Sequence, residues 1–148
     1  MHFVVKLYKM KKIIFSALLV FICTATTLAQ CDKNFVINSS KTEYLDADSN
    51  LQRTVDENTV IDFTRPTFTI SPPDKKMTAV ITSETCDWKV PFAEGSTILK
   101  GTFKNEEGNE INATITIEGK DGKLLLWVSS AEMPAIIRVP IDKFEQKN

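Results

Sequence analysis

The sequence predicts an all-β domain of eight or nine antiparallel strands, arranged as a barrel or, alternatively, as a β-sandwich. Residues 111–118 alternate strictly between apolar and polar side chains, which is typical of a strand with one buried face. Short apolar segments recur along the chain between clusters of turn residues, at the close spacing typical of a sandwich or barrel. The short turns favour antiparallel order, and no amphipathic helix longer than two turns is predicted.

The first 29 residues are predicted to be a secretory signal peptide. Four lysines and no acidic residue precede an apolar segment of 11 residues, 13–23. Small side chains at Thr27 and Ala29 suit cleavage after Ala29. The apolar segment is too short for a spanning helix, which needs about 20 residues. We expect translation to begin at Met1 or, with a more compact basic region, at Met10.

Residues 30–148 are predicted to form a single domain, because no linker or repeat divides these 119 residues. The leader holds four of the 18 basic residues, so 14 remain against 19 acidic residues, a net charge of −5. This balance argues against nucleic acid as a partner, since binding to phosphates requires a basic face. No segment of this part is long and apolar enough to predict a spanning helix.

Strands are expected wherever apolar residues alternate between turn signals. In the first half these are 35–37, extended or restarted at 43–45, then 51–55, 61–63, 68–70, 77–82 and 85–90. The polar cluster 46–50 and the segment 71–74 are predicted turns. Pro66 cannot donate to a ladder, so it predicts an edge, a bulge or a turn.

The second half is expected to hold strands at 98–103, 111–117, 124–128 and 136–141. Asp121-Gly122 predicts a two-residue hairpin turn, and this fixes the register on both sides of it. Ile117 should then face Leu126, and Ile115 should face Val128. Leu125 and Trp127 would point to the opposite face, beside Glu118 and Thr116. We expect the N-terminal segment near Cys31, the chain around Phe144 or a partner to cover Trp127, since an exposed Leu-Trp pair is unfavourable in water.

Cys31 and Cys86 are predicted to form one disulfide, because an even pair in an exported protein is most simply oxidised. Closing this loop would stabilise the fold by roughly 4 kcal/mol in the chain-entropy model. An alternative stays open. Residues 28–31 resemble the lipobox of bacterial lipoproteins, with Gln30 in place of the usual small residue; Cys31 would then be lipidated and Cys86 would remain a thiol.

The chemistry of the mature chain argues against catalysis. The one histidine, His2, lies in the leader, so zinc sites and serine or cysteine triads lack their usual base or ligand. No cofactor, catalytic residue or metal ligand is predicted. A glycosidase-type site would need two carboxylates across a cleft, one of them buried. Nothing in the sequence indicates that any candidate carboxylate is buried. The candidates are Asp56, Glu57, Asp62, Asp87, Glu106 and Glu107.

A partial calcium-loop pattern comprises Asp46, Asp48, Asn50 and Glu57. Leu51 stands where that loop needs glycine, and Arg53 stands where it is normally apolar. A solvated hairpin turn is the preferred interpretation.

Three segments carry a resemblance to small secreted bacterial lipocalin-like domains: the turn 46–50, Val60 to Phe63, and the hairpin 115–126. The Gly-x-Trp signature of that family is absent, and Phe35-Val36-Ile37 occupies its place. The resemblance implies an eight-stranded up-and-down barrel whose cup holds a small apolar ligand.

The aromatic inventory leaves open whether the barrel is filled or hollow. It comprises Tyr44, Phe63, Phe68, Trp88, Phe92, Phe103 and Trp127, which would either fill a core or line a cup. The ligand-binding residues are unknown at this point. The first functional hypothesis is an exported, non-enzymatic binding protein for a small apolar ligand, in the periplasm, the cell envelope or outside the cell. The second is an envelope module that recognises a protein or glycan through its outer face, and an alternative anchor is the lipidated Cys31.

Overall fold

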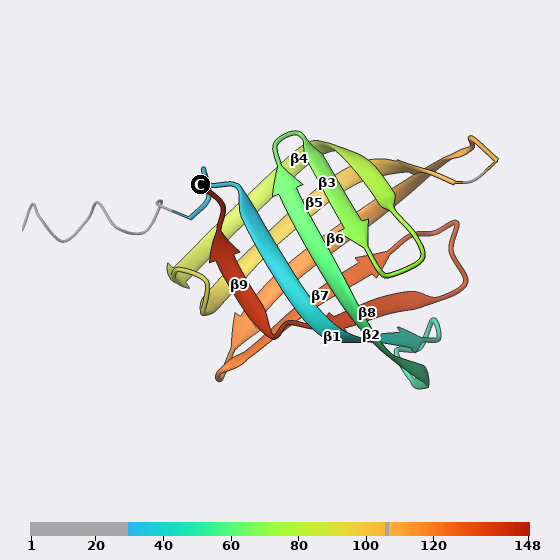
Figure 1. Cartoon of the computed structure of the whole chain (residues 1–148), viewed down its shortest axis with the longest axis horizontal. Coiled ribbons are helices and arrows are strands. Elements are labelled where there is room, and N and C mark those ends of the chain that lie inside the picture. Colours follow the sequence, from blue (N-terminus) through green and yellow to red (C-terminus); the bar gives the residue numbers. More distant parts are fainter. Residues whose placement is uncertain (1–29, 106) are drawn as a thin grey trace, which may run out of the picture.

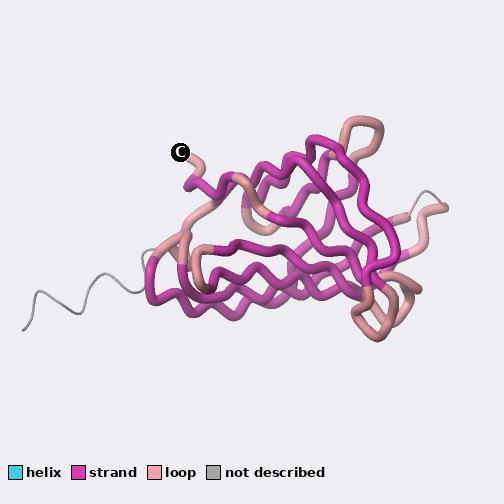
Figure 2. The backbone as a smooth tube through the Cα atoms, turned by 90° about the horizontal axis from the view of Figure 1, so that it is seen from below, coloured by secondary structure: helices cyan, strands magenta, loops and turns pink. Residues whose placement is uncertain are grey.

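The computed structural model describes residues 30–105 and 107–148, and these residues form strands and turns only (Figures 1 and 2). The predicted signal peptide and Glu106 lie outside the described residues. The strands are β1 Phe35–Leu45, β2 Leu51–Thr64, β3 Thr67–Ser71, β4 Met77–Val90, β5 Glu94–Lys104, β6 Glu110–Lys120, β7 Lys123–Ser129, β8 Ile136–Pro140 and β9 Lys143–Gln146.

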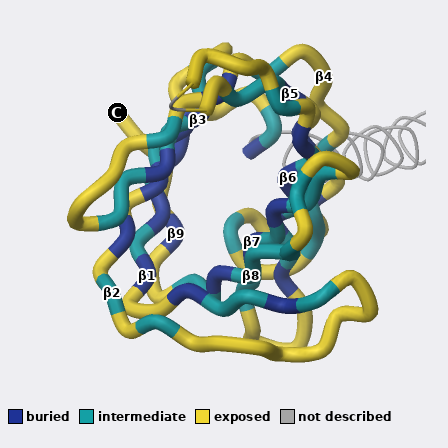
Figure 3. Tube along the Cα trace, turned by 90° about the vertical axis from the view of Figure 1, so that its right-hand side faces the viewer, coloured by how far each residue is buried: buried dark blue, intermediate teal, exposed yellow. Residues whose placement is uncertain are grey.

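The strands close into an antiparallel barrel, so the predicted barrel is confirmed over the sandwich alternative. Neighbouring strands pair in chain order from β2 to β8, and β1 pairs with both β2 and β8 to complete the ring. Figure 3 looks along the barrel and shows this ring of strands. β9 is the one strand of the described residues outside the ring of eight, and it pairs with β1 alone.

One edge of β1 is shared between two strands. Residues 43–45 pair with β8, whereas residues 35–38 pair with β9. The chain changes partner between Ile141, whose N–H donates to the Leu124 carbonyl at 3.0 Å, and Asp142, whose N–H donates to the Asn38 carbonyl at 2.9 Å. The chain therefore leaves β7 after Ile141, and β9 pairs with the start of β1. The predicted strand 136–141 matches β8 to within one residue, but the further strand β9 was missed.

Two predicted breaks are wrong. The segments 51–55 and 61–63 are parts of one strand, β2, and the segments 77–82 and 85–90 are parts of β4. The polar residues between these predicted segments remain in the sheet because β1 pairs with most of β2, and β5 pairs with most of β4. Register shifts between Ser39 and Lys41 and between Ile81 and Ser83 absorb the irregular residues as bulges.

The register of the β6–β7 hairpin is confirmed. Ile117 pairs with Leu126 and Ile115 with Val128, while Trp127 lies opposite Thr116. Asp121 and Gly122 take φ values of 53° and 75°, as a primed two-residue turn requires. Ile115 and Ile117 of β6 are buried and Trp127 is on the outer face.

The two ends of the barrel differ. We call the end with the β2–β3, β4–β5 and β6–β7 turns and the C-terminus the plugged end, and the opposite one the open end; they lie at the left and right of Figure 1. An aromatic cluster fills the plugged end, with ring centroids of interacting pairs 4.7 to 6.0 Å apart. Its members are Phe35, Phe63, Phe68, Trp88, Phe92 and Phe144.

Candidate functional site

A cavity of about 580 Å³ lies in the barrel at the open end. Its wall is formed by pairs of residues that face each other across neighbouring strands: Ile70 with Met77, Phe103 with Ile111, and Val128 with Ile137. Met133 from the β7–β8 connection completes the apolar lining. The volume lies within the range of about 300 to 1,000 Å³ that is typical of small-molecule pockets.

Small residues occur in the barrel wall next to this cavity. Gly101 pairs with Ala113, and Ala79 lies opposite Phe103 on the next strand. All three small residues are buried in the wall. At the plugged end, by contrast, six aromatic rings pack against one another inside the barrel.

The mouth of the cavity is polar and carries three lysines. Lys75 and Lys76 come from the β3–β4 turn, where the Lys75 N–H donates to the Pro72 carbonyl at 3.4 Å. Lys104 ends β5, and Glu107 from the following turn accepts a hydrogen bond from Asn109 Nδ2 at 3.3 Å. Among the described residues, these three lysines take part in no ion pair within 4 Å.

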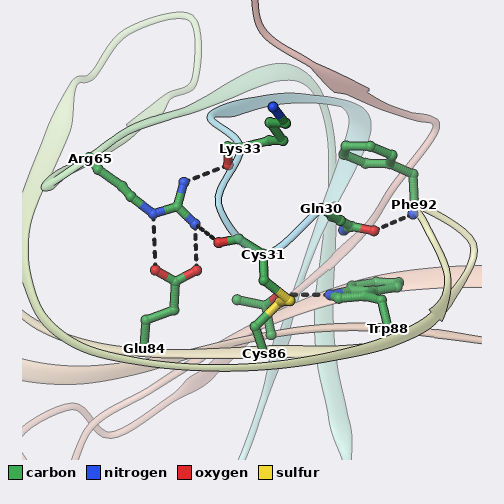
Figure 4. Close-up of a disulfide and its surroundings, with 9 residues drawn as sticks. Gln30, Cys31, Lys33, Arg65, Glu84, Cys86, Trp88 and Phe92 are labelled. Atoms are coloured by element: carbon green, nitrogen blue, oxygen red, sulfur yellow. Dashed lines mark hydrogen bonds and ion pairs between the residues drawn. A yellow bond between two sulfur atoms is a disulfide. The ribbon is translucent and has the colours of Figure 1, made fainter. Parts of the chain in front are cut away.

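The plugged end is closed by the N-terminal segment, residues 30–34, which lies beside the second half of β4 (Figure 4). β3 pairs only with the first residues of β4, 77–80, and so leaves the later edge of β4 without a neighbouring strand from β3. Cys31 is joined to Cys86 on this part of β4, with Cα atoms 5.7 Å apart. The predicted disulfide is therefore present, and it holds the start of the domain against the barrel.

Arg65 is the second anchor of the N-terminal segment. Its guanidinium donates to both carboxylate oxygens of Glu84, at 3.0 Å from Nε and 2.5 Å from Nη2. The same group donates to the carbonyl of Lys33 at 2.6 Å and to the carbonyl of Cys31. Arg65 thus links the β2–β3 turn, β4 and the N-terminal segment in one network (Figure 4).

Two further contacts complete the plug. The Gln30 side-chain oxygen accepts a hydrogen bond from the Phe92 N–H. The buried Trp88 donates from Nε1 to Thr97 Oγ1 at 2.8 Å, so its polar atom is satisfied inside the barrel. This end of the barrel is therefore packed and hydrogen-bonded.

Two of the three covers expected for Trp127, the segment near Cys31 and the chain around Phe144, are wrong. Phe144 lies inside the barrel against Trp88, and Cys31 lies against Cys86 at the plugged end. Neighbouring side chains on the outer face cover the indole instead: Trp127 Nε1 donates to Glu118 Oε1 at 2.9 Å, and the Arg138 guanidinium lies 5.3 Å from the ring centroid. Arg138 also forms an ion pair with Glu43, so the cover is a cross-strand network.

The 46–50 segment is the turn between β1 and β2, as its preferred interpretation predicted. The Asp46 carboxylate accepts hydrogen bonds from the N–H groups of Asp48 at 3.0 Å and Asn50 at 2.9 Å. The hydrogen bond from the Asn50 backbone is the main cause that lowers the pKa of Asp46 below its usual value. Glu57 lies in β2 rather than in this turn.

The candidate catalytic carboxylates are spread over different elements. Asp56, Glu57 and Asp62 are in β2, Asp87 is in β4, and Glu107 is in the β5–β6 turn. Within the described part of the chain, no three histidine, cysteine or acidic side chains gather as a metal site. Partial burial alone would raise the pKa of Asp62, but hydrogen bonds from Lys147 at 2.7 Å and Thr64 at 2.7 Å lower it below its usual value.

The aromatic residues split between the two roles that the sequence left open. Phe63, Phe68, Trp88 and Phe92 belong to the aromatic cluster, Phe103 lines the cavity, and Tyr44 lies under the Arg53 guanidinium at 4.2 Å. Sequence reasoning missed Phe35 and Phe144 as members of the cluster. It also did not find the cavity residues, although the alternation of 111–117 already placed Ile111 on the inner face.

A second hollow of about 540 Å³ lies beside the β7–β8 connection and is lined mainly by small and polar side chains. Several of these are already hydrogen-bonded: Thr102 to Asn112 at 3.3 Å, and Thr82 to the Lys100 carbonyl at 3.3 Å. The apolar cavity is therefore the stronger candidate for a ligand.

Comparison with family models, with curated proteins and with solved structures found no match for this chain. The described residues contain no helix that is long and apolar enough to cross a membrane.

Proposed function

We propose that this protein is an exported, non-enzymatic binding protein that holds a small apolar ligand in the open end of its barrel, in the manner of lipocalin-like domains. The observation that carries this proposal is the division of the barrel interior. One end is filled by aromatic rings and closed by the N-terminal segment, whereas the other holds an apolar cavity of about 580 Å³. A barrel that only needed stability would gain by filling both halves, because each buried apolar side chain contributes about 1.5–3 kcal/mol.

The disulfide supports export. Such bonds persist in oxidising compartments, and this one agrees with the secretory leader expected from the first 29 residues. With its sulfur bonded to Cys86, Cys31 has no thiol for a lipid thioether. We therefore favour cleavage after Ala29 over the lipoprotein anchor, and propose the periplasm, the envelope or the extracellular space as the location.

Binding of the neutral apolar dye N-phenylnaphthylamine tests the proposal. Its fluorescence should rise on addition of the oxidised protein, and Ile111→Trp should weaken its binding at least about tenfold because the larger indole occupies part of the cavity. Ile98→Trp is the matched control, since Ile98 is on the neighbouring strand β5 but 37% exposed on the outer face.

A second blocking variant, Ile137→Phe, guards against a folding defect in the first, and circular dichroism verifies both. Equal dye binding by the wild type and both blocked variants would show that the cavity is not the binding site. Native mass spectrometry of the purified protein should, in addition, reveal retained small molecules.

A further inference from the structure

We infer that the ligand of the cup is a single-chain amphiphile with an anionic head group, and that Lys75, Lys76 and Lys104 bind that head group at the mouth. This inference rests on the proposed function, because it assigns the chemistry of the same cavity.

The wall of the cavity accepts only an apolar part of a ligand. Its inner positions from β3 to β8 carry aliphatic, thioether and phenyl side chains. A polar head placed among them would lose its hydration without gaining a partner, which is strongly unfavourable. An amphiphile must therefore insert its apolar chain and leave its head at the open end.

The mouth provides the complementary charge. Three of the residues that line the cavity are lysines, against one described carboxylate, Glu107, which is hydrogen-bonded to Asn109. Lys76 also acts on Asp62, whose pKa it helps to lower, but Asp62 already has Lys147 as its ion-pair partner at 2.7 Å. Among the described residues that line the cavity, the charge is therefore positive, although the mature chain is acidic. Two acidic residues that do not line the cavity lie close by: Asp74 precedes Lys75, and Glu110 pairs with Lys104.

Lysine is suited to this position. Its aliphatic stem can lie along the apolar wall while the ammonium group stays in water at the rim. A carboxylate and a phosphate monoester share the required chemistry, one apolar chain with one anionic head, and the ammonium groups would attract either.

Calorimetric titration with ligands of one chain length separates the contribution of the head group to the affinity from that of the alkyl chain. Laurate, lauryl phosphate, lauryl alcohol and laurylamine have the same alkyl chain, and we expect affinity to fall in the order anions, alcohol, amine. Lys75→Gln combined with Lys76→Gln should weaken binding of the anions about three- to tenfold and leave the alcohol unchanged. Higher salt should weaken the binding of the two anions and leave that of the alcohol unchanged.

The matched control is Lys120→Gln combined with Lys123→Gln, which removes the same charge at the plugged end beside the β6–β7 turn. It should leave the affinity for laurate within about twofold of the wild type. Whichever of laurate and lauryl phosphate binds more tightly identifies the source of the head group.

The outcomes separate the two proposals. If the alcohol binds as tightly as the anions and the Lys75, Lys76 variant does not change the affinity, the head-group inference is wrong. The proposal that the cavity binds an apolar ligand then still stands. If none of the four ligands binds and the dye does not bind either, the proposed function itself fails.

Discussion

Arg65 and Glu84 form a two-point ion pair that closes the side of the barrel where β3 is too short to cover β4. The two side chains are only 28% and 24% exposed, and the same guanidinium holds two carbonyls of the N-terminal segment. Partial burial and the paired geometry make this contact stronger than a surface ion pair. The closure of the plugged end therefore depends on polar contacts as well as on aromatic packing.

Arg65→Met should lower the free energy of unfolding by about 1–3 kcal/mol, because it leaves Glu84 and two carbonyls without their donor. Urea unfolding measures this change. Lys143→Met is the control: its partner Glu145 is 51% exposed, and the loss should stay within about 0.5 kcal/mol. Equal effects of the two substitutions would argue against Arg65 as an anchor.

Reduction of the disulfide, or Cys31→Ser combined with Cys86→Ser, should lower stability by about 2–4 kcal/mol. The residues are 55 positions apart, so the bond restricts a long loop of the unfolded chain. Thermal denaturation with and without reductant measures the loss. An unchanged melting temperature would show that the Arg65 network and the Gln30 contact suffice to hold the segment.

The mature chain is expected to begin at Gln30 and to carry the Cys31–Cys86 bond. Intact mass of the exported protein should match residues 30–148 with two hydrogens fewer, and alkylation without reductant should label neither cysteine. Cyclisation of Gln30 to pyroglutamate would lower the mass further by one ammonia. A diacylglycerol mass with Cys31 as the first residue, and alkylation of Cys86 alone, would establish the lipoprotein instead.

Ile115→Ala should destabilise the barrel by about 2–5 kcal/mol, because Ile115 is 0% exposed and the truncation leaves a cavity. Trp127→Ala should cost less, since the indole is on the outer face and its loss frees Glu118 and Arg138 to water. Chemical unfolding of both variants compares them directly. A larger loss for Trp127→Ala would mean that the outer network is the stronger support.

Acid should weaken the contact between Asp62 and Lys147. Asp62 has a lowered pKa in the folded state, so its stabilising effect is present above the unfolded value of 3.8 and is lost as pH falls through the lower folded value. Stability measured from neutral to acidic pH should fall less steeply in Asp62→Asn and in Lys147→Met. If the stability of both variants falls as steeply with pH as that of the wild type, other carboxylates cause the acid sensitivity.

The sequence by itself determined those features that depend on neighbouring residues. The alternation of 111–118 and the Asp121-Gly122 turn fixed the β6–β7 register, because side chains alternate faces and a two-residue turn leaves one pairing. The Asp46–Asn50 turn followed in the same way from local side-chain hydrogen bonds. The strand content and the pairing of the two cysteines also required no three-dimensional information.

Tertiary structure alone decided which half of the barrel is filled. The aromatic cluster joins Phe35 from the first strand to Phe144 from the last. At the mouth of the cavity, Lys75 from the β3–β4 turn lies with Lys104 from the end of β5, 29 positions further along the chain. β2 and β4 stay continuous through polar residues because distant partners pair with them along most of their lengths. Such contacts form only when the barrel closes. Local sequence propensity cannot predict them, because the partners are far apart in the chain.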